Sequence, residues 1–304
     1  MKNRGENGAG TAPAGTQKSE KTELAVALTI AGSDSGGGAG TQADLLTFAA
    51  LGVFGTTAIS ALTAQNPDGV SGVRAVPADF VREQAEQVAK FFKIRAAKTG
   101  MLANAEIIGA AADFFEKNPE IRIVADPVMI ATSGAKLLAP DAIGALRERL
   151  LPLAALVTPN LDEAEVLLGE KIAWRENAVA SHGEICTTAA RLAETLGVPA
   201  LLKGGHARGD EISDVLAFPR TLGVQTQIFT HPRISGTDTH GSGCTLSAAI
   251  AAEIAKFSAA GADFSANALA ECVARAEAFL HEAIAAPIRV SGRNFIAHLR
   301  TLSA

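Results

Sequence analysis

The chain has 304 residues, of which 48% are hydrophobic and 19% are charged, so it is long enough to bury a large core as one α/β domain. Its formal net charge of −5 excludes the basic surface that general nucleic-acid binding requires. No apolar run reaches the length of a membrane span, and the three cysteines lack the paired spacing of a zinc site or a disulfide framework. We therefore expect small-molecule partners, no nucleic acid, no membrane and a reducing, cytoplasmic location.

The first 23 residues differ in composition from the rest of the chain. They are rich in Gly, Ala, Thr and Lys, and they contain no apolar run that could serve as the core of a signal peptide. We predict a disordered N-terminal tail at 1–23 and a single domain at 24–304.

Strand and helix patterns alternate from residue 24 onward. An apolar run at 24–32 ends in glycine, which is typical of a strand buried on both faces of a parallel sheet, and a helical pattern follows at 41–51. Further strands are predicted at 56–64, 96–102, 121–125, 155–158 and 200–206, helices at 77–92, 105–115, 140–150, 184–196 and 264–286, and a hairpin at 213–218 and 224–230. This alternation predicts a three-layer α/β/α fold around a doubly wound, mainly parallel sheet.

A glycine-rich loop, SDSGGGAG at 33–40, joins the first strand to the first helix. It lacks the Lys of a phosphate-binding P-loop. It also lacks the acidic residue that follows a dinucleotide-binding fingerprint after about 20 positions. The loop is interpreted either as backbone that closes over a small molecule, with Asp34 as a hydrogen-bonding group, or as a solvent-facing turn.

A second glycine turn, Gly241-Ser242-Gly243-Cys244, opens an alanine-rich helical segment. The first turn of a helix offers unpaired N–H groups and a positive dipole end, so this turn is a candidate site for a phosphate or an oxyanion. A plain tight turn is the alternative. Cys244 lies where the dipole lowers a thiol pKa, which makes it a candidate proton acceptor or nucleophile, and His240 lies beside it.

Polar side chains follow several predicted strands, where ligands bind in open α/β sheets. Gln65 offers an amide suited to the edge of a heterocycle, and Asp126 suits either a metal-linked phosphate or a loop cap. Asn160 and Glu163 fit a helix capping box, or an oxygen-rich pair that could hold hydrated Mg²⁺. Lys203 could neutralise a phosphate. Together with the second glycine turn, these groups are the kinds of residue that an enzyme of phosphoryl transfer uses for positioning and charge neutralisation.

Seven strings in order resemble the hydroxymethylpyrimidine/phosphomethylpyrimidine kinases of thiamine biosynthesis, a family of the ribokinase superfamily. They are AGSDSGGGAGTQADL, ALTAQN, KTGML, DPVM, TPNLDEAEVLL, LLKGGH and THGSGCTLSAAIAA, and they span about residues 24 to 286. The resemblance implies a single ribokinase-like domain that uses ATP with Mg²⁺, and a homodimer. It also implies phosphorylation of 4-amino-5-hydroxymethyl-2-methylpyrimidine and then of its monophosphate.

The resemblance also implies roles for particular residues. Gln65 would contact the pyrimidine, and Gly32, Met101 and Val128 would line the same pocket, to which Asp34 is also assigned.

The phosphoryl side follows in the same way. Asn160 and Glu163 would organise Mg²⁺ and its water, Lys203 would meet an ATP phosphate with Asp126 nearby, and residues 241–244 would form the anion hole.

Three features depart from relatives. Cys244 stands where sugar kinases of the superfamily carry an aspartate base, so this thiol, with an ordinary pKa of about 8.5, is either a dipole-assisted base or a group that positions the hydroxymethyl group. Ser242 replaces a usual Thr. The tail at 291–298 differs from the Gly-Pro-Val type of the family, which puts closure of the site by the C-terminus in doubt.

Rival functions remain open at this point. Pyridoxal kinases carry the same motifs and take a similar aromatic alcohol, and a vitamin-binding protein without catalysis would keep the scaffold. The missing ribose-binding acid disfavours a dehydrogenase. A cysteine hydrolase built on Cys244 and His240 lacks an ordered set of partner residues.

Overall fold

The computed structural model describes residues 23–129, 138, 141–172, 174, 181–205, 209–222 and 226–299. Residues 1–22 of the predicted tail lie outside this part of the chain, and the division into tail and single domain stays a prediction.

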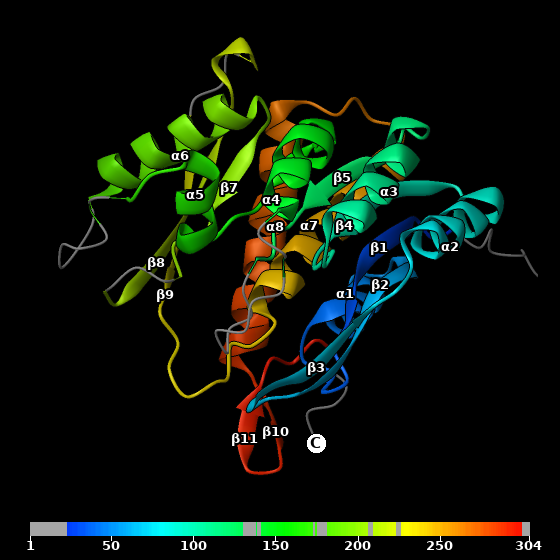
Figure 1. Cartoon of the computed structure of the whole chain (residues 1–304). Coiled ribbons are helices and arrows are strands. Elements are labelled where there is room, and N and C mark those ends of the chain that lie inside the picture. The colour runs from blue at the N-terminus through cyan, green and yellow to red at the C-terminus, as the bar shows by residue number, and fades with distance from the viewer. Residues whose placement is uncertain are drawn as a thin grey trace, which may run out of the picture.

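A nine-stranded sheet forms the centre of the molecule, in the order β3-β2-β1-β4-β5-β6-β7-β8-β9 (Figure 1). Its parallel strands are β2 (Phe54–Asn66), β1 (Val26–Ser33), β4 (Ile94–Thr99), β5 (Arg122–Ala125), β6 (Leu156–Val157) and β7 (Ala200–Leu202). Antiparallel β3 (Gly69–Ala75) closes one edge, and the hairpin of β8 (Glu211–Ala217) and β9 (Thr226–Pro232) closes the other. The predicted doubly wound, mainly parallel α/β fold is confirmed.

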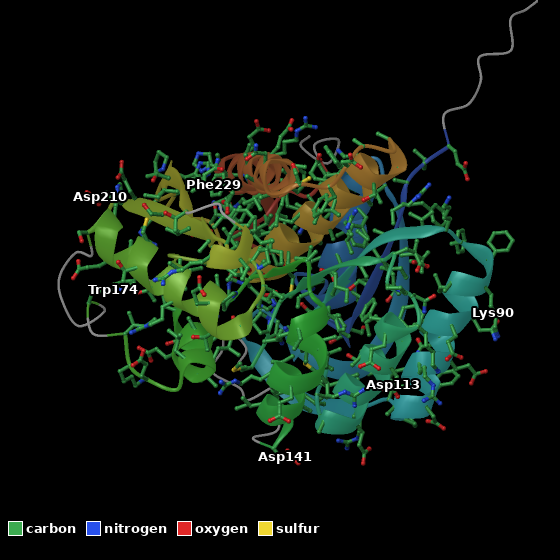
Figure 2. The ribbon with its side chains drawn as sticks, turned by 90° about the horizontal axis from the view of Figure 1, so that it is seen from above. Lys90, Asp113, Asp141, Trp174, Asp210 and Phe229 are labelled. Atoms are coloured by element: carbon green, nitrogen blue, oxygen red, sulfur yellow. The ribbon has the colours of Figure 1, made fainter. Side chains whose placement is uncertain are left out.

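Helices cover both faces of the sheet. One layer contains α2 (Ala78–Phe91), α3 (Ala105–Glu116), α4 (Ala142–Ala145), α5 (Leu161–Leu168) and α6 (His182–Leu196). The other contains α1 (Gly40–Ala50), α7 (Ser242–Ala259) and α8 (Ala266–Ala285), and Figure 2 shows Asp113 of α3 and Asp141 before α4 on the side opposite α7 and α8. Over the described part of the chain, no helix combines the length and apolar character that a membrane crossing needs.

The strands build two cores because successive side chains point to opposite faces of a sheet. In β1, Leu28 and Ile30 pack under α2 and α3, whereas Ala27 faces the layer of α1 and α7. In β5, Ile123 faces the layer of α2 and α3, and Val124 faces the layer of α1 and α7. This burial on both faces explains why the strands read as continuous apolar runs.

Some elements differ from the sequence-based expectation. Strand β2 runs on to Asn66 and pairs with β3, which was not predicted because its sequence, GVSGVRA, has no alternating apolar pattern, and none of its residues is buried. The predicted helix at 140–150 is a single α-turn, α4, followed by a π-helical turn at Leu146–Leu150. A short hairpin of β10 (Ile288–Val290) and β11 (Arg293–Phe295) was also missed.

The C-terminal segment packs against the beginning of α7. His298 Nε2 lies 2.9 Å from Thr245 Oγ1, and the Arg293 guanidinium lies 2.7 Å from Asp68 Oδ1 at the tip of the β2–β3 hairpin (Figure 1). The end of this segment, at His298, therefore lies beside the helix that opens at the second glycine turn.

Candidate active site

One pocket of about 650 Å³ lies at the carboxyl ends of the parallel strands. It brings together every residue that the sequence analysis assigned to a site. These residues are Gly32, Asp34, Gln65, Met101, Asp126, Val128, Asn160, Glu163, Lys203, Gly241, Ser242, Gly243 and Cys244.

The second glycine turn is the candidate site for an anion, and we call its residues 241–244 the anion site. Helix α7 starts at Ser242, and Gly241 caps it with a left-handed φ of 82° and without a hydrogen bond from any described side chain. A Cβ at position 241 would overlap the carbonyl oxygen of Gly38, so only glycine fits there. The N–H groups and positive dipole end of an 18-residue helix therefore face the pocket.

Lys203 stands beside this helix start. Its Nζ lies 2.9 Å from Asp126 Oδ1, and a Cβ added to Gly243 would lie 3.2 Å from the same Nζ. Burial alone would lower the pKa of Lys203, but the charges of Asp126 and Glu163 outweigh burial and raise it. The side chain is therefore a fixed cation next to the anion site.

Asn160 and Glu163 form a capping box at the start of α5. The Asn160 N–H donates to Glu163 Oε2 at 2.9 Å, and the Glu163 N–H donates to Asn160 Oδ1 at 2.9 Å. Glu163 is only 5% exposed, and burial raises its pKa to about 7, although the charge of Lys203 opposes this. The carboxyl group is therefore divided between its neutral and charged forms near neutral pH.

The first glycine-rich loop is organised by Asp34. Its carboxylate accepts hydrogen bonds from the N–H groups of Gly36 and Ala39, each at 2.8 Å, and Oδ2 lies 3.2 Å from His240 Nε2. Burial would raise the pKa of Asp34, but these hydrogen bonds together lower it. His240 also lies 3.1 Å from Gln65 Nε2, so it joins the loop before α7 to the end of β2.

The opposite wall at this end of the pocket is apolar. A Cβ on Gly32 would lie 3.2 Å from Met101 Cε, so the absence of a side chain at 32 makes room for that methionine. Val128 lines the pocket beside them. This side suits the face of a small aromatic ring.

A buried ion pair lies close to Cys244. The Lys98 ammonium contacts the Asp44 carboxylate at 2.8 and 2.9 Å, Thr29 Oγ1 donates to Asp44 at 2.6 Å, and the side chains of Lys98 and Asp44 are 0% exposed. Burial raises the pKa of the Cys244 thiol even though Lys98 opposes this. The dipole effect expected from sequence is thus outweighed, and the neutral thiol is favoured.

Sequence reasoning missed several groups in or near the pocket. Asp44 sits within an ordinary helical pattern, and no local signal pairs it with Lys98. Asp214 and Glu277 also line the pocket, the former accepting a hydrogen bond of 2.7 Å from the Gly204 N–H. Only strand pairing across the β7–β8 edge reveals this contact.

Comparisons with known proteins show the family of the chain. The model of the phosphomethylpyrimidine kinase family matches residues 34–297. A hydroxymethylpyrimidine/phosphomethylpyrimidine kinase of Rhizobium meliloti is 46% identical over 277 residues, covering 90% of this chain and 97% of that protein. One from Haemophilus influenzae is 42% identical over 268 residues, covering 86% of this chain and 92% of that protein.

Two solved structures of kinases are similar to this chain. A phosphomethylpyrimidine kinase from Clostridium difficile aligns with a TM-score of 0.68 and 35% identity, covering 86% of this chain and all of that one (100%). A Bacillus subtilis pyridoxal kinase in complex with ADP aligns with a TM-score of 0.75 and 33% identity, covering 92% of this chain and 100% of that one. With the family model matched across most of the chain, this protein belongs to the phosphomethylpyrimidine kinase family.

Proposed function

We propose that the protein transfers the γ-phosphoryl group of ATP to the hydroxyl group of 4-amino-5-hydroxymethyl-2-methylpyrimidine, and then to the resulting monophosphate. The observation that carries this proposal is the single pocket in which the anion site, Lys203, Cys244 and the amide of Gln65 all meet. Phosphoryl transfer needs little covalent chemistry from the protein, so positioning and charge neutralisation account for most of catalysis.

The phosphate groups of ATP would lie on the anion site. The Ser242 N–H donates to the Thr239 carbonyl, which leaves the N–H groups of Gly243 and Cys244 for phosphate oxygens, and the helix dipole favours negative charge there. Lys203 adds a full positive charge at the same place. These groups are directed at the phosphoryl group whose charge must be stabilised during transfer.

The residues near Lys203 also fit a magnesium ion. The carboxyl oxygens of Asp126 and Glu163 are the hard ligands that Mg²⁺ prefers, and Asn160 holds Glu163 in place through the capping box. Among the described residues no group of three or more His, Cys, Asp or Glu could hold a metal. Mg²⁺ is usually held by one or two carboxylates together with substrate phosphates. When bound, the ion would neutralise charge on those phosphates.

The pyrimidine would lie between Gln65 and the apolar wall. Because the Asp34 carboxylate can only accept, His240 Nε2 carries the proton that joins them, and this protonated nitrogen cannot accept a hydrogen bond from Gln65 Nε2, which lies 3.1 Å away. The NH₂ group of Gln65 is thereby left to donate to a ring nitrogen of the pyrimidine. Met101 and Val128 would contact the ring and its methyl group.

Cys244 is assigned a positioning role in this scheme. A neutral thiol, which burial favours, can hydrogen-bond to the hydroxymethyl oxygen and hold it in line with the donor phosphate. Because the transition state of phosphoryl transfer is loose, early removal of the hydroxyl proton is not required.

Product analysis by mass spectrometry tests the proposal, using the purified protein with Mg·ATP and either the pyrimidine alcohol or pyridoxal. Monophosphate followed by diphosphate of the pyrimidine is the expected result. Pyridoxal phosphate as the sole product would instead support a pyridoxal kinase. The likeness to the Bacillus subtilis pyridoxal kinase, with a TM-score of 0.75, keeps this the second candidate. No product from either compound would contradict both activities.

We also propose a homodimer, as the family resemblance implies, and a cytoplasmic location, as the few unpaired cysteines indicate. Sedimentation equilibrium of the purified chain would show a mass of about 31.1 kDa if the protein is instead a monomer.

A further inference from the structure

The pocket continues past Lys203 between the β8–β9 hairpin and helix α8. Four titratable side chains line this part, which we call the outer wall: Asp214 on β8, His231 on β9, and Glu277 and His281 on α8. The function proposed above gives none of them a role.

The outer wall is tightly connected. Asp214 is fixed by the Gly204 N–H, and its carboxyl group is within hydrogen-bonding reach of Glu277, which is only 5% exposed. The rings of His231 and His281 stack with centroids 4.9 Å apart and an interplanar angle of 22°. Burial, and then the negative charge of Asp214, raise the pKa of Glu277 well above its ordinary value. The two carboxyl groups therefore share a proton.

Two buried polar atoms of the outer wall lack hydrogen-bond partners. Glu277 Oε1 and His231 Nε2 are buried and have no hydrogen-bond partner within the described parts of the chain. Glu277 Oε2 and His231 Nε2 are 3.8 Å apart, which is too long for a hydrogen bond. If Oε1 is the oxygen of Glu277 that shares the proton with Asp214, His231 Nε2 still has no partner among the described residues. Buried groups in this state are costly unless a ligand or water satisfies them.

The position of these groups indicates what the ligand offers. Phosphates on the anion site and Lys203 would direct the nucleoside of the donor toward the outer wall. A further phosphate is a poor match for a carboxyl pair, because like charges repel. Sugar hydroxyls both donate and accept, which matches a carboxyl oxygen beside an imidazole nitrogen, and acidic side chains bind ribose hydroxyls in other nucleotide sites.

We propose that Glu277, together with His231, binds the sugar hydroxyls of the phosphoryl donor and thereby selects ribonucleotides over 2′-deoxyribonucleotides. This inference rests on the proposed kinase function. Leu280 and Ile284, one and two turns further along α8, line the same pocket and give the base an apolar surface.

The test compares kcat/KM for ATP and 2′-deoxy-ATP, with inosine triphosphate as a third donor. The wild type is expected to prefer ATP over 2′-deoxy-ATP by about tenfold, chiefly through KM, as the loss of one hydrogen bond to a buried group implies. Glu277→Ala should reduce this preference to about twofold or less. Glu277→Gln should keep most of it, because its amide can donate to Asp214 and still present an oxygen.

Glu271→Gln is the matched control. It makes the same chemical change on α8 at an exposed glutamate that pairs with Arg275, and it should leave kcat/KM unchanged for both ATP and 2′-deoxy-ATP. A wild type without preference, or an unchanged preference in Glu277→Ala, would overturn the proposal. So would a change confined to the ratio of ATP to inosine triphosphate, since that places Glu277 against the base.

The two proposals can fail separately. If the wild type phosphorylates neither pyrimidine nor pyridoxal, the proposed function fails, and calorimetric binding of ATP and 2′-deoxy-ATP still measures the sugar preference. Equal affinity for the two nucleotides in that assay would overturn the role of Glu277 independently of turnover.

Discussion

Replacing Glu163 with glutamine should remove a pH-dependent loss of stability. Burial raises the pKa of Glu163 to about 7, compared with an ordinary value of 4.5. The folded state therefore binds a proton that the unfolded state has already released, so stability is greatest below about pH 4.5 and falls as pH rises toward 7. The glutamine side chain in Glu163→Gln carries no titrating proton but can still serve as the third residue of a capping box.

The magnitude follows from the two pKa values. A pKa difference of one corresponds to about 1.4 kcal/mol, so this group alone lowers the free energy of unfolding by about 2.5 kcal/mol between about pH 5 and about pH 8. Urea denaturation of wild type and Glu163→Gln, followed by circular dichroism across this range, measures the difference. Other groups titrate in both proteins and cancel.

Glu184 supplies the control, because it occupies the same position in the capping box of α6 with Ser181. Hydrogen bonds from Ser181 lower the pKa of Glu184, so its contribution is present above its ordinary pKa and is lost on acidification. Glu184→Gln should therefore show no stability gain toward high pH. If Glu163→Gln and wild type lose stability in parallel as pH rises, Glu163 is ionised in the free protein and the argument from its burial is wrong.

Four further substitutions test the site. Cys244→Ala should lower kcat about tenfold or more while the affinity for ATP, measured by calorimetry, is kept; unchanged turnover would reduce Cys244 to a packing residue. Gln65→Ala should raise KM for the pyrimidine about tenfold and spare ATP, so an unchanged pyrimidine KM would remove it from that pocket. Lys98→Met should cost about 3–5 kcal/mol in urea denaturation, because it leaves Asp44 buried and unpaired, and a cost below about 1 kcal/mol would show that Asp44 takes up a proton instead. Gly241→Ala should abolish phosphoryl transfer in a steady-state assay, because its φ of 82° and the Gly38 oxygen exclude a Cβ; near-normal rates would show that the loop adjusts.

Local features of the site could be predicted from the sequence. The capping box of Asn160 and Glu163 depends on residues three apart, and the glycine turn before α7 depends on four consecutive residues, so spacing alone predicts both. Strand ends likewise placed Gln65, Asp126 and Lys203 at one edge of the sheet, as they are in the structure.

Properties that depend on contacts between residues far apart in the sequence could not be predicted from it. Asp44 and Lys98 are 54 positions apart, and only the packing of α1 on the sheet brings them together. The raised pKa of Cys244 follows from burial, which the first turn of a helix does not reveal. Strand β3 has no strand pattern of its own and depends on pairing with β2.

Two lysines beneath the anion site each have an acidic partner before any substrate binds. Lys98 is paired with Asp44, and Lys203 is paired with Asp126. A carboxylate in place of Cys244 would add a negative charge near both acids, whereas a thiol adds none while its proton is retained. Asp126 offsets part of the Lys203 charge as long as the two side chains are paired. If Asp126 holds Mg²⁺ as proposed, more of the Lys203 charge would be available to the phosphates, so we expect the ion and the nucleotide each to bind more tightly in the presence of the other.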